Sequence, residues 1–524
     1  VKMPLVSVLL AALLCAVSSA LKPVVIVPGL AGSGLFASIE KAVLPKCSKS
    51  KTFSRSRQRL WLSLSELYYN ECLFDVLEMV YSNSTGFYEN KQGVSIEADD
   101  FGGLHGISHL GYLVRETIPV VGEFAQMISA LKAAGHKERE TLFGIPYDWR
   151  LAPQQIDWSS VKRLSEEAVR KNGGEKIVWV AHSLGNIMSS YFFNAVVDAE
   201  WKEKHIDSFL SIAGPYGGTP TQHKAYLSGY NDFFKLTDKI ALVKPLVVRK
   251  LQRTSGASFT LLPREELWGD AATFIVNEGG DDRGPSVYSS GNWTGALEEG
   301  LRGEVEKGVQ LMGDSLWRDP LLPTVCVWGQ MEGNKGDVPV AYEYASADYD
   351  KEPKITRTEA GDGTVAVRSA RQCSEWKHSA LSLELPKKHL DLIMTTQVIQ
   401  IAVDLSTGDL ETVVERESEN RKRRKSFKQM KKEEEARTTN LRLRRSGSPV
   451  FRNETEGEID GVSVVDETKL TQMWNMYVEV AESHPGASRE EIDSIFEQRV
   501  TAKEEEQKQL QRESLRVEET LAIA

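Results

Sequence analysis

Lys176 to Tyr191 reads KIVWVAHSLGNIMSSY and carries the strongest signal for the fold. A β-branched apolar run enters a tight turn of small residues around Ser183, and the chain leaves that turn in a helical pattern. This arrangement is typical of a nucleophile elbow, in which small residues two positions either side of the serine, here Ala181 and Gly185, let strand and helix pass closely. Glycine is usual at both places, so Ala181 departs from the pattern. An ordinary strand-to-helix turn is the alternative interpretation.

The composition indicates a folded protein with a large core. The chain has 524 residues, of which 41% are hydrophobic and 26% are charged. A chain of this length and composition is expected to form one large domain with additional segments. The net charge of −10 argues against nucleic acid as a partner.

The first 20 residues are expected to be a secretory signal peptide. Their apolar run is too short to span a bilayer comfortably, and the small residues Ser18 and Ala20 suit cleavage before Leu21. An uncleaved membrane anchor is the alternative. The protein is therefore expected in the secretory pathway, either secreted or in an acidic or secretory vesicle compartment.

The cysteine count favours two disulfides. Cleavage of the signal segment removes Cys15 and leaves four cysteines in a chain directed to an oxidising compartment. Three pairings are possible, and we prefer Cys47 with Cys72 and Cys326 with Cys373 because each pair closes a local loop.

Three acceptor sequons for glycosylation fit the same route. They lie at Asn83, Asn292 and Asn453. Such triplets are also common by chance.

Strand and helix patterns alternate along the first half of the chain. Strands are expected at Val24–Val27, Ile177–Val180 and Phe209–Ile212, and a helix is expected over Ile187–Val197. This alternation predicts βαβ units and a parallel sheet. The loop from Gly29 has neither a G-K-[ST] ending nor G-x-G-x-x-G spacing, so nucleotide binding is not expected.

The alternation of strand and helix patterns stops over about residues 215–323, where an inserted cap is expected. The sheet then resumes at Thr324–Trp328, continues in the loop around Asp362, and ends near Leu381–Leu385, followed by a helix over Leu390–Leu405.

The composition changes again beyond the sheet. Residues 406–463 are rich in basic and other polar residues and are expected to form a disordered linker, while 464–524 regain helical spacing and are expected to form an accessory tail. The linker is interpreted as a solvated tail. Basic clusters such as Arg421–Lys425 could alternatively contact anionic lipid or serve as cleavage sites.

A serine nucleophile requires a histidine base and an acid that orients it, and in sheet-based hydrolases these follow in the order Ser, Asp, His. Asp362 lies in a glycine-flanked loop, although Asp-Gly is also a common turn. Downstream of it are His378 and His389. His389 is favoured because it falls between an apolar run and a helix, and His378 is the alternative.

Acyl chemistry also requires donors for a tetrahedral oxyanion. The backbone N–H groups of Leu30 and Leu184 are expected to supply them, because one donor follows the nucleophile and one comes from an early loop. The chain has no H-E-x-x-H motif and no C-x-x-C pair, so no metal or other cofactor is expected.

Several ordered motifs carry a family resemblance. The chain resembles the lecithin:cholesterol acyltransferase family, which includes lysosomal phospholipases and phospholipid:diacylglycerol acyltransferases. The motifs span about residues 23–400 and read PVVIVPGLAGSGL, Leu60-Trp61, IPYDWRLAP, AHSLG, GPYGGTP, RTSGASFTLLP, GDGTVAVRS and His389-Leu390. The tail beyond about residue 406 lies outside the resemblance.

The resemblance implies an α/β-hydrolase fold with a mainly parallel sheet over residues 21–405, a cap with a lid, and a membrane-binding loop region, followed by the partly disordered charged tail. It implies catalytic roles for Ser183, Asp362 and His389 and oxyanion roles for Leu30 and Leu184. It also supports the two preferred disulfides.

The resemblance further implies two mobile or exposed elements. A disulfide-closed lid region over about residues 43–115 would contact lipid through Leu60, Trp61 and Leu62, unless Trp61 is packed beneath the loop. A mobile active-site lid would lie within Thr221–Leu246.

The function that the resemblance implies is acyl transfer from glycerophospholipid through an acyl-Ser183 intermediate. The acceptor would be water or an alcohol such as a sterol or diacylglycerol, and the partner would be a phospholipid membrane or lipid particle. The sequence identifies no protein activator. A non-catalytic lipid-binding protein and a soluble carboxylesterase or lipase are the alternatives.

Overall fold

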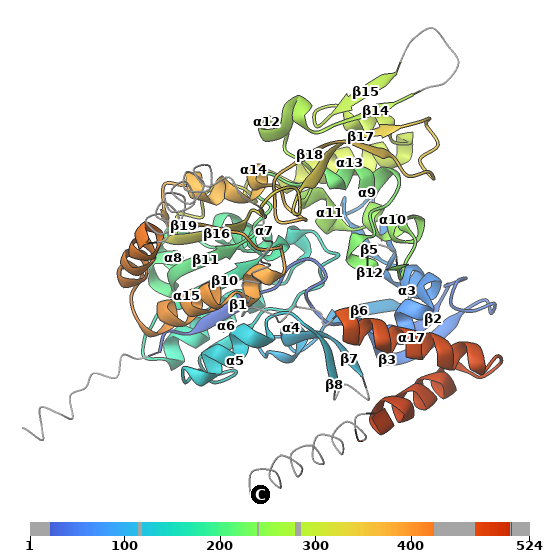
Figure 1. Ribbon diagram of the computed structural model, residues 1–524, viewed down its shortest axis with the longest axis horizontal. Coiled ribbons are helices and arrows are strands. Elements are labelled where there is room, and N and C mark those ends of the chain that lie inside the picture. The colour runs from blue at the N-terminus through green and yellow to red at the C-terminus, as the bar shows by residue number, and fades with distance from the viewer. Residues whose placement is uncertain are drawn as a thin grey trace, which may run out of the picture.

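The computed structural model describes residues 21–113, 118–237, 240–277, 285–423, 467–503 and 505. At its centre is a sheet of six parallel strands (Figure 1). Across the sheet the strands are β19 (Ser379–Leu385), β16 (Thr324–Gly329), β11 (Ile206–Ile212), β10 (Ile177–His182), β1 (Val24–Val27) and β9 (Leu142–Gly144). The expected parallel sheet is confirmed. The expected signal peptide and Asn453 lie outside the described residues.

Strand β10 shows why this sheet is buried on both faces. All six of its residues are buried. Ile177, Trp179 and Ala181 belong to one apolar cluster, whereas Val178 and Val180 belong to another. Because successive side chains of a strand point to opposite faces, the two clusters are the two cores of a three-layer domain.

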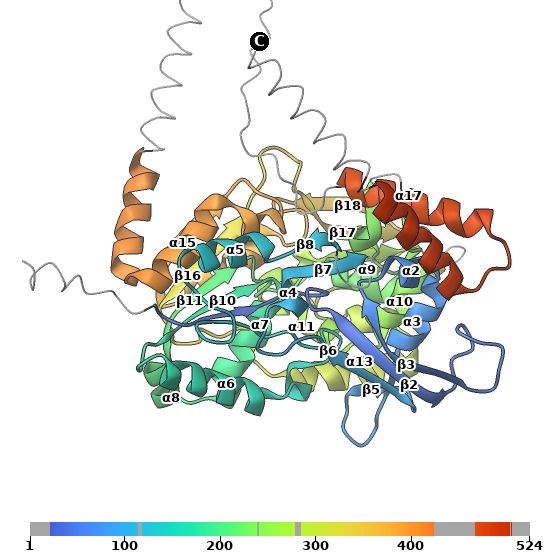
Figure 2. The ribbon, with the colours of Figure 1, turned by 90° about the horizontal axis from the view of Figure 1, so that it is seen from below.

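Helices cover both faces of the sheet, and Figure 2 shows them on opposite sides of it. The first face packs against α6 (Trp158–Lys171), α7 (Leu184–Tyr191) and α8 (Ala199–His205), and the second against α5 (Ala125–Ala133) and α15 (Thr396–Thr407). The side chain of Asp157 caps α6 by accepting the N–H of Ser160 at 3.2 Å. The helix expected over Leu390–Leu405 is instead a 3₁₀ turn, η7 (Asp391–Met394), followed by α15.

A second sheet forms the core of the cap at the top of Figure 1. Its strands, in order, are β15 (Ser286–Ser289), β14 (Thr273–Val276), β17 (Val338–Tyr344) and β18 (Lys354–Glu359). Because β17 pairs with β14, residues 338–359 belong to this sheet. The cap therefore extends beyond the expected boundary at 323. Its helices are α9 (Thr221–Leu227), α10 (Pro245–Arg253), α11 (Gly256–Thr260), α12 (Glu265–Trp268) and α13 (Glu299–Met312).

A third sheet supports the disulfide-closed region. It consists of β3 (Phe53–Trp61), β2 (Leu35–Ala42) and β6 (Val94–Ala98), next to α2 (Leu64–Tyr68) and α3 (Asn70–Leu77). Shorter elements complete this half of the chain, namely β4 (Met79–Tyr81), β5 (Tyr88–Asn90), α4 (His105–Ser108), β7 (His109–Leu113), β8 (Ile118–Gly122), β12 (Lys235–Thr237) and β13 (Ile240–Ala241).

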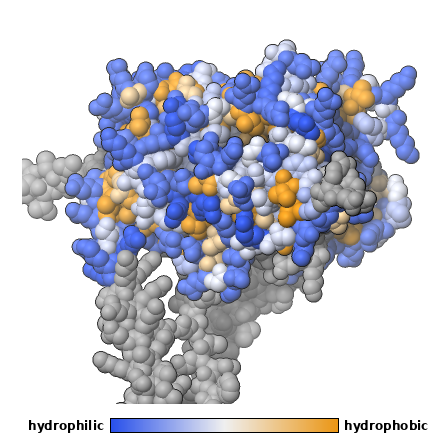
Figure 3. Space-filling model, turned by 90° about the horizontal axis from the view of Figure 1, so that it is seen from above, coloured by the Kyte–Doolittle hydropathy of each residue, from blue (hydrophilic) through white to orange (hydrophobic). Residues whose placement is uncertain are grey.

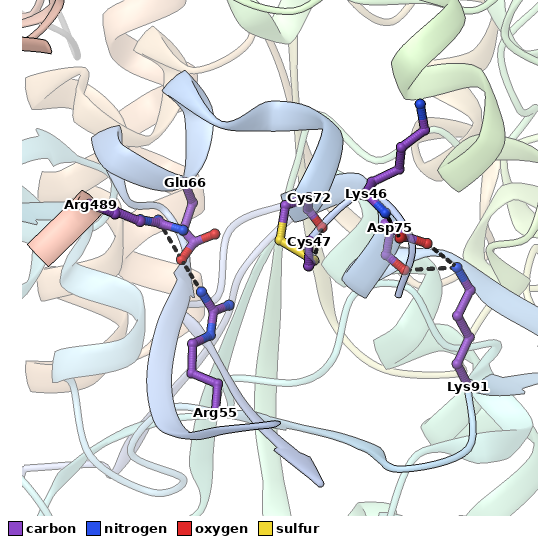
Figure 4. Close-up of a disulfide and its surroundings, with 8 residues drawn as sticks. All are labelled: Lys46, Cys47, Arg55, Glu66, Cys72, Asp75, Lys91 and Arg489. Carbon is purple, nitrogen blue, oxygen red and sulfur yellow. Dashed lines mark hydrogen bonds and ion pairs between the residues drawn. A yellow bond between two sulfur atoms is a disulfide. The ribbon is translucent and has the colours of Figure 1, made fainter. Parts of the chain in front are cut away.

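Both preferred disulfide pairings are confirmed. Cys47 and Cys72 join the loop after β2 to α3, with Cα atoms 4.5 Å apart (Figure 4). Cys326 and Cys373 join β16 to the 3₁₀ helix η6 (Arg371–Glu375), with Cα atoms 5.7 Å apart.

The segment expected to be a disordered linker begins as a helix. Residues 410–423 are helical, with Val413 1% and Glu417 3% exposed. The Gln397 side-chain amide donates to Glu417 at 2.6 Å, which fastens this helix to α15. The start of the segment is therefore part of the packed domain. Residues 424–466 lie outside the described residues.

The C-terminal tail forms two helices, α17 (Glu467–Ser483) and a helix over 489–503, and it lies next to α2 in Figure 2. Tyr477 is 1% exposed and packs on the ring of Tyr68 at 5.4 Å between centroids. Arg489 forms an ion pair of 2.6 Å with Glu66, which also pairs with Arg55 at 3.0 Å (Figure 4). The tail is thus a docked part of the structure.

Replacing Glu66 by alanine is expected to lower the free energy of unfolding by about 3–5 kcal/mol, because both arginines lose a carboxylate that is 0% exposed. The matched control is Glu97→Ala. Glu97 is 60% exposed and pairs with Arg57, so that loss should stay below about 1 kcal/mol. Urea titration measures both values, and equal losses would contradict this account of the tail contact.

Candidate active site

Ser183 has the geometry of the expected elbow. It lies between β10 and α7 with φ 52° and ψ −126°, a left-handed conformation that exposes the side chain at the turn. Its N–H donates to the carbonyl oxygen of Ile212 at 2.9 Å. A Cβ on Gly185 would lie 2.4 Å from the carbonyl oxygen of Pro28, so only glycine allows this close approach of helix to strand.

Asp362 and His389 form a buried pair at the same edge of the sheet. His389 Nδ1 lies 2.8 Å from Asp362 Oδ2, and the two residues are 4% and 1% exposed. Asp362 Oδ1 accepts the N–H groups of Thr364 and Val365 at 2.9 and 2.7 Å. Asp362 packs beside the last residue of β16, and His389 follows β19, so both lie at carboxyl ends of strands, as Ser183 does.

His182, which the sequence analysis did not single out, supports His389. Its Nε2 donates to the carbonyl oxygen of His389 at 3.2 Å, and the two rings are 4.8 Å apart. Burial, together with the nearby His389, lowers the pKa of His182 well below its usual value. A neutral His182 can therefore hold the backbone of His389 without adding a charge to the site.

The alternative base, His378, lies in another cluster. Its Nδ1 is 2.9 Å from Asp319 Oδ2, and its side chain is 35% exposed. The structure thus pairs Asp362 with His389 and gives His378 a different carboxylate.

The loop with the expected oxyanion donor lies against the serine. A Cβ on Gly29 would be 2.9 Å from Ser183 Cβ. The turn is closed by the N–H of Gly32, which donates to the carbonyl oxygen of Gly29 at 3.1 Å, and the Tyr147 hydroxyl donates to the carbonyl oxygen of Pro28 at 3.0 Å. These contacts hold the loop close to the turn that leads into Leu184.

An apolar pocket opens at Ser183. Leu30 lines it, as do aromatic and aliphatic side chains from the cap, the disulfide-closed region and the segment after β9, chiefly Trp61, Trp149, Phe234, Val248 and Leu251. Such a lining suits a hydrocarbon chain.

The expected lipid-contacting role of Leu60 and Trp61 is wrong for this structure. Leu60 is 0% and Trp61 5% exposed. Trp61 Nε1 donates to the carbonyl oxygen of Ala31 at 2.7 Å, and its ring packs on Trp149 and Phe234 at 5.3 and 5.6 Å. Pairing of β3 with β2 turns Trp61 inward, so it forms part of the pocket wall, as the alternative interpretation held.

Trp61→Ala is expected to lower the free energy of unfolding by about 3–5 kcal/mol because it empties a packed aromatic site. Trp61→Phe keeps a ring there and loses the hydrogen bond to Ala31, so a loss of about 1 kcal/mol is expected. Denaturant unfolding measures both. An alanine variant of unchanged stability that no longer binds vesicles would support an exposed, lipid-contacting Trp61 instead.

The other expected surface residues lie as follows. Leu62 is half-buried and packs against the apolar cluster of the tail. Asn83 and Asn292 are exposed, as glycosylation requires.

On the face in Figure 3, hydrophobic residues form small patches among hydrophilic ones. In the described part of the chain, no helix has the length and apolar character needed to cross a bilayer. The same residues include no group of three His, Cys, Asp or Glu that could hold a metal ion.

The parallel sheet and the left-handed serine between β10 and α7 define the class of the protein as an α/β hydrolase. A family model described as lecithin:cholesterol acyltransferase matches residues 56–293. Over these residues the chain is similar to this family. The match ends before Asp362 and His389, so the pairing of those two residues comes from the structure.

Similar proteins have related descriptions. The human lysosomal phospholipase A and acyltransferase is 29% identical over 391 residues, which cover 71% of this chain and 87% of that protein. The phosphatidylcholine-sterol acyltransferase of Rattus norvegicus is 26% identical over 404 residues, which cover 72% and 83%. Among solved structures, a chain of the Tle4–Tli4 complex superposes with a TM-score of 0.44 and 12% identity, covering 75% of this chain and 98% of that one.

Proposed function

We propose that this protein transfers an acyl group from a glycerophospholipid by way of an acyl-Ser183 intermediate. The observation that carries the proposal is the position of Ser183, which lines an apolar pocket, while the adjoining His182 donates a hydrogen bond to His389 of the buried Asp362–His389 pair. The names of the two similar enzymes support phospholipid as the acyl donor.

The first half of the reaction forms the intermediate. His389 takes the proton of the Ser183 hydroxyl as its oxygen attacks the ester carbonyl, and Asp362 holds the tautomer in which Nδ1 carries a proton. The N–H groups of Leu30 and Leu184 would stabilise the oxyanion. The bond to the glycerol oxygen then breaks, and that oxygen takes the proton from His389.

The second half releases the acyl group to an acceptor. His389 removes a proton from water or from an alcohol, which attacks the acyl ester and restores Ser183. Water gives a free fatty acid, whereas a sterol or diacylglycerol gives a new ester. The predicted secretory route, with Asn83 and Asn292 exposed, fits an enzyme that meets lipid at a membrane or particle surface.

The test uses the purified full chain with vesicles of acyl-labelled phosphatidylcholine, alone and with sterol or diacylglycerol. We expect the label to leave the phospholipid as fatty acid, with steryl ester or triacylglycerol added if the alcohol is an acceptor. No release from any vesicle would contradict the proposal. Hydrolysis of small dissolved esters alone would favour a soluble carboxylesterase.

A further inference from the structure

A buried carboxyl group lies behind the expected oxyanion loop. Glu123 directly follows β8, is 3% exposed, and has an Oε2 atom without a hydrogen-bond partner among the described residues. Its backbone is fixed because its N–H donates to the carbonyl oxygen of Ser108 at 3.0 Å. Burying a carboxyl group away from any cation costs free energy, so such a group needs a physical reason.

The carboxyl group contacts the turn formed by residues 29–32. It accepts the N–H of Gly29, and a Cβ on Gly32 would lie 2.5 Å from Glu123 Oε1. On the other side of this turn, a Cβ on Gly29 would lie 2.9 Å from Ser183 Cβ. Gly29 therefore lies between Glu123 and the serine.

We propose that Glu123, in its protonated form, is a positioning residue that holds the Gly29–Gly32 turn against Ser183. The proposal rests on the acyl-transfer function proposed above. By accepting the N–H of Gly29, Glu123 fixes the peptide next to Leu30, whose own N–H is the expected oxyanion donor. A misplacement of such a donor by about 1 Å can cost on the order of 10²-fold in rate.

The surroundings favour the protonated form. Burial raises the pKa of Glu123 well above its usual value, and burial together with Glu123 raises the pKa of Tyr147, which favours the neutral form of each group. Burial also lowers the pKa of His109 and His182. Among the described residues, the titratable and charged groups on the neighbouring elements are Tyr147, His109, His182 and the Arg59–Asp99 ion pair, whose Asp99 also contacts His105 of α4. An ionised Glu123 would oppose the negative charge that develops at the oxyanion.

The raised pKa of Glu123 determines the direction in which the stability of the protein changes with pH. The unfolded chain ionises Glu123 near its ordinary value of 4.5, whereas the folded protein holds the proton to higher pH. The stability that the protonated Glu123 contributes is fully present below the pKa of Glu123 in the unfolded chain. It is lost as pH rises through the pKa of Glu123 in the folded protein. Glu123→Gln keeps the accepting oxygen and cannot ionise. Its stability relative to the unchanged protein should therefore increase as pH rises.

The test compares the unchanged protein with Glu123→Gln, Glu123→Asp and the control Glu140→Gln, whose carboxyl is 65% exposed. Urea unfolding and the rate at which a fluorophosphonate labels Ser183 are measured from pH 4 to pH 9. We expect the unchanged protein to lose stability and labelling rate as pH rises through the folded pKa of Glu123, and Glu123→Gln to lack this loss. Glu123→Asp, with a shorter acid, should label up to about 10²-fold more slowly. Glu140→Gln should behave as the unchanged protein.

The outcomes separate this proposal from the proposed function. Identical pH curves for the unchanged protein and Glu123→Gln would overturn the role of Glu123, as would an unchanged labelling rate in Glu123→Asp. If Glu123→Gln does not fold, the labelling rate of Glu123→Asp alone tests the role of Glu123. The fluorophosphonate could label Ser183 in no variant while the stability curves still differ as expected. That result would support the protonated Glu123 and contradict the acyl-Ser183 mechanism.

Discussion

Replacing Ser183 by alanine is expected to lower kcat for release of the acyl group by on the order of 10⁶-fold, because no other atom can form the ester intermediate. The hydroxyl caps no backbone group of α7, and the turn is held by the Ser183 N–H, which alanine retains. The variant should therefore fold normally. Labelled phosphatidylcholine vesicles measure the rate, and thermal unfolding confirms the fold.

A folded Ser183→Ala variant that still released acyl product at an appreciable fraction of the original rate would remove Ser183 from the mechanism. A variant that bound vesicles as before and released nothing would agree with the account. It would also exclude a purely lipid-binding function for the unchanged protein, since only an enzyme has turnover to lose.

Asp362→Asn is expected to lower kcat by on the order of 10⁴-fold. Asparagine can still accept the N–H groups of Thr364 and Val365, so the loop should keep its shape. Its amide N–H₂, however, would face His389 Nδ1 in place of Asp362 Oδ2 and favour the wrong tautomer. Initial rates on the same vesicles measure the loss, and KM should change much less than kcat.

The matched control for this change is Asp319→Asn. It alters the other carboxylate–histidine pair, in which Asp319 lies 2.9 Å from His378. We expect its kcat to stay close to that of the unchanged protein. A large loss in Asp319→Asn together with an active Asp362→Asn would transfer the role of base from His389 to His378.

The elements of the candidate site could be predicted because each leaves a local pattern. A strand, a small-residue turn and a helix identify Ser183, and chain order with flanking apolar runs identifies Asp362 and His389. The disulfides followed from an even cysteine count and short separations. Apolar runs at Val24–Val27 and Thr324–Trp328 are long enough to mark central strands.

The other features of the structure could not be predicted because they depend on contacts between segments that are distant in the sequence. Residues 338–359 read as part of the main domain, but β17 finds its partner in β14 of the cap. Trp61 lies between Leu60 and Leu62 in a disulfide-closed region, which suggested an exposed apolar cluster, yet β3 pairs with β2 and turns the ring into the pocket. The apolar spacing of the tail predicted helices and could not show that Tyr477 packs on Tyr68.

Two buried polar residues near the site were missed for the same reason. His182 belongs to the elbow sequence, but its hydrogen bond to His389 spans 207 positions of the chain. Glu123 sits in a Gly-Glu-Phe string without any motif, and only the fold brings it to Gly29. Because glutamate is rarely buried, a single glutamate between an apolar hairpin and a helix is expected at the surface and does not predict an interior carboxyl group.

The central claim is that the acyl group passes through the oxygen of Ser183. The most direct measurement is mass spectrometry of the protein quenched in acid within milliseconds of mixing with phosphatidylcholine vesicles, followed by peptic digestion. The account predicts the mass of one fatty acyl group on the peptide that carries Ser183, and none on the same peptide of Ser183→Ala. An acyl group on another residue, or turnover with no acylated peptide at any quench time, would contradict it.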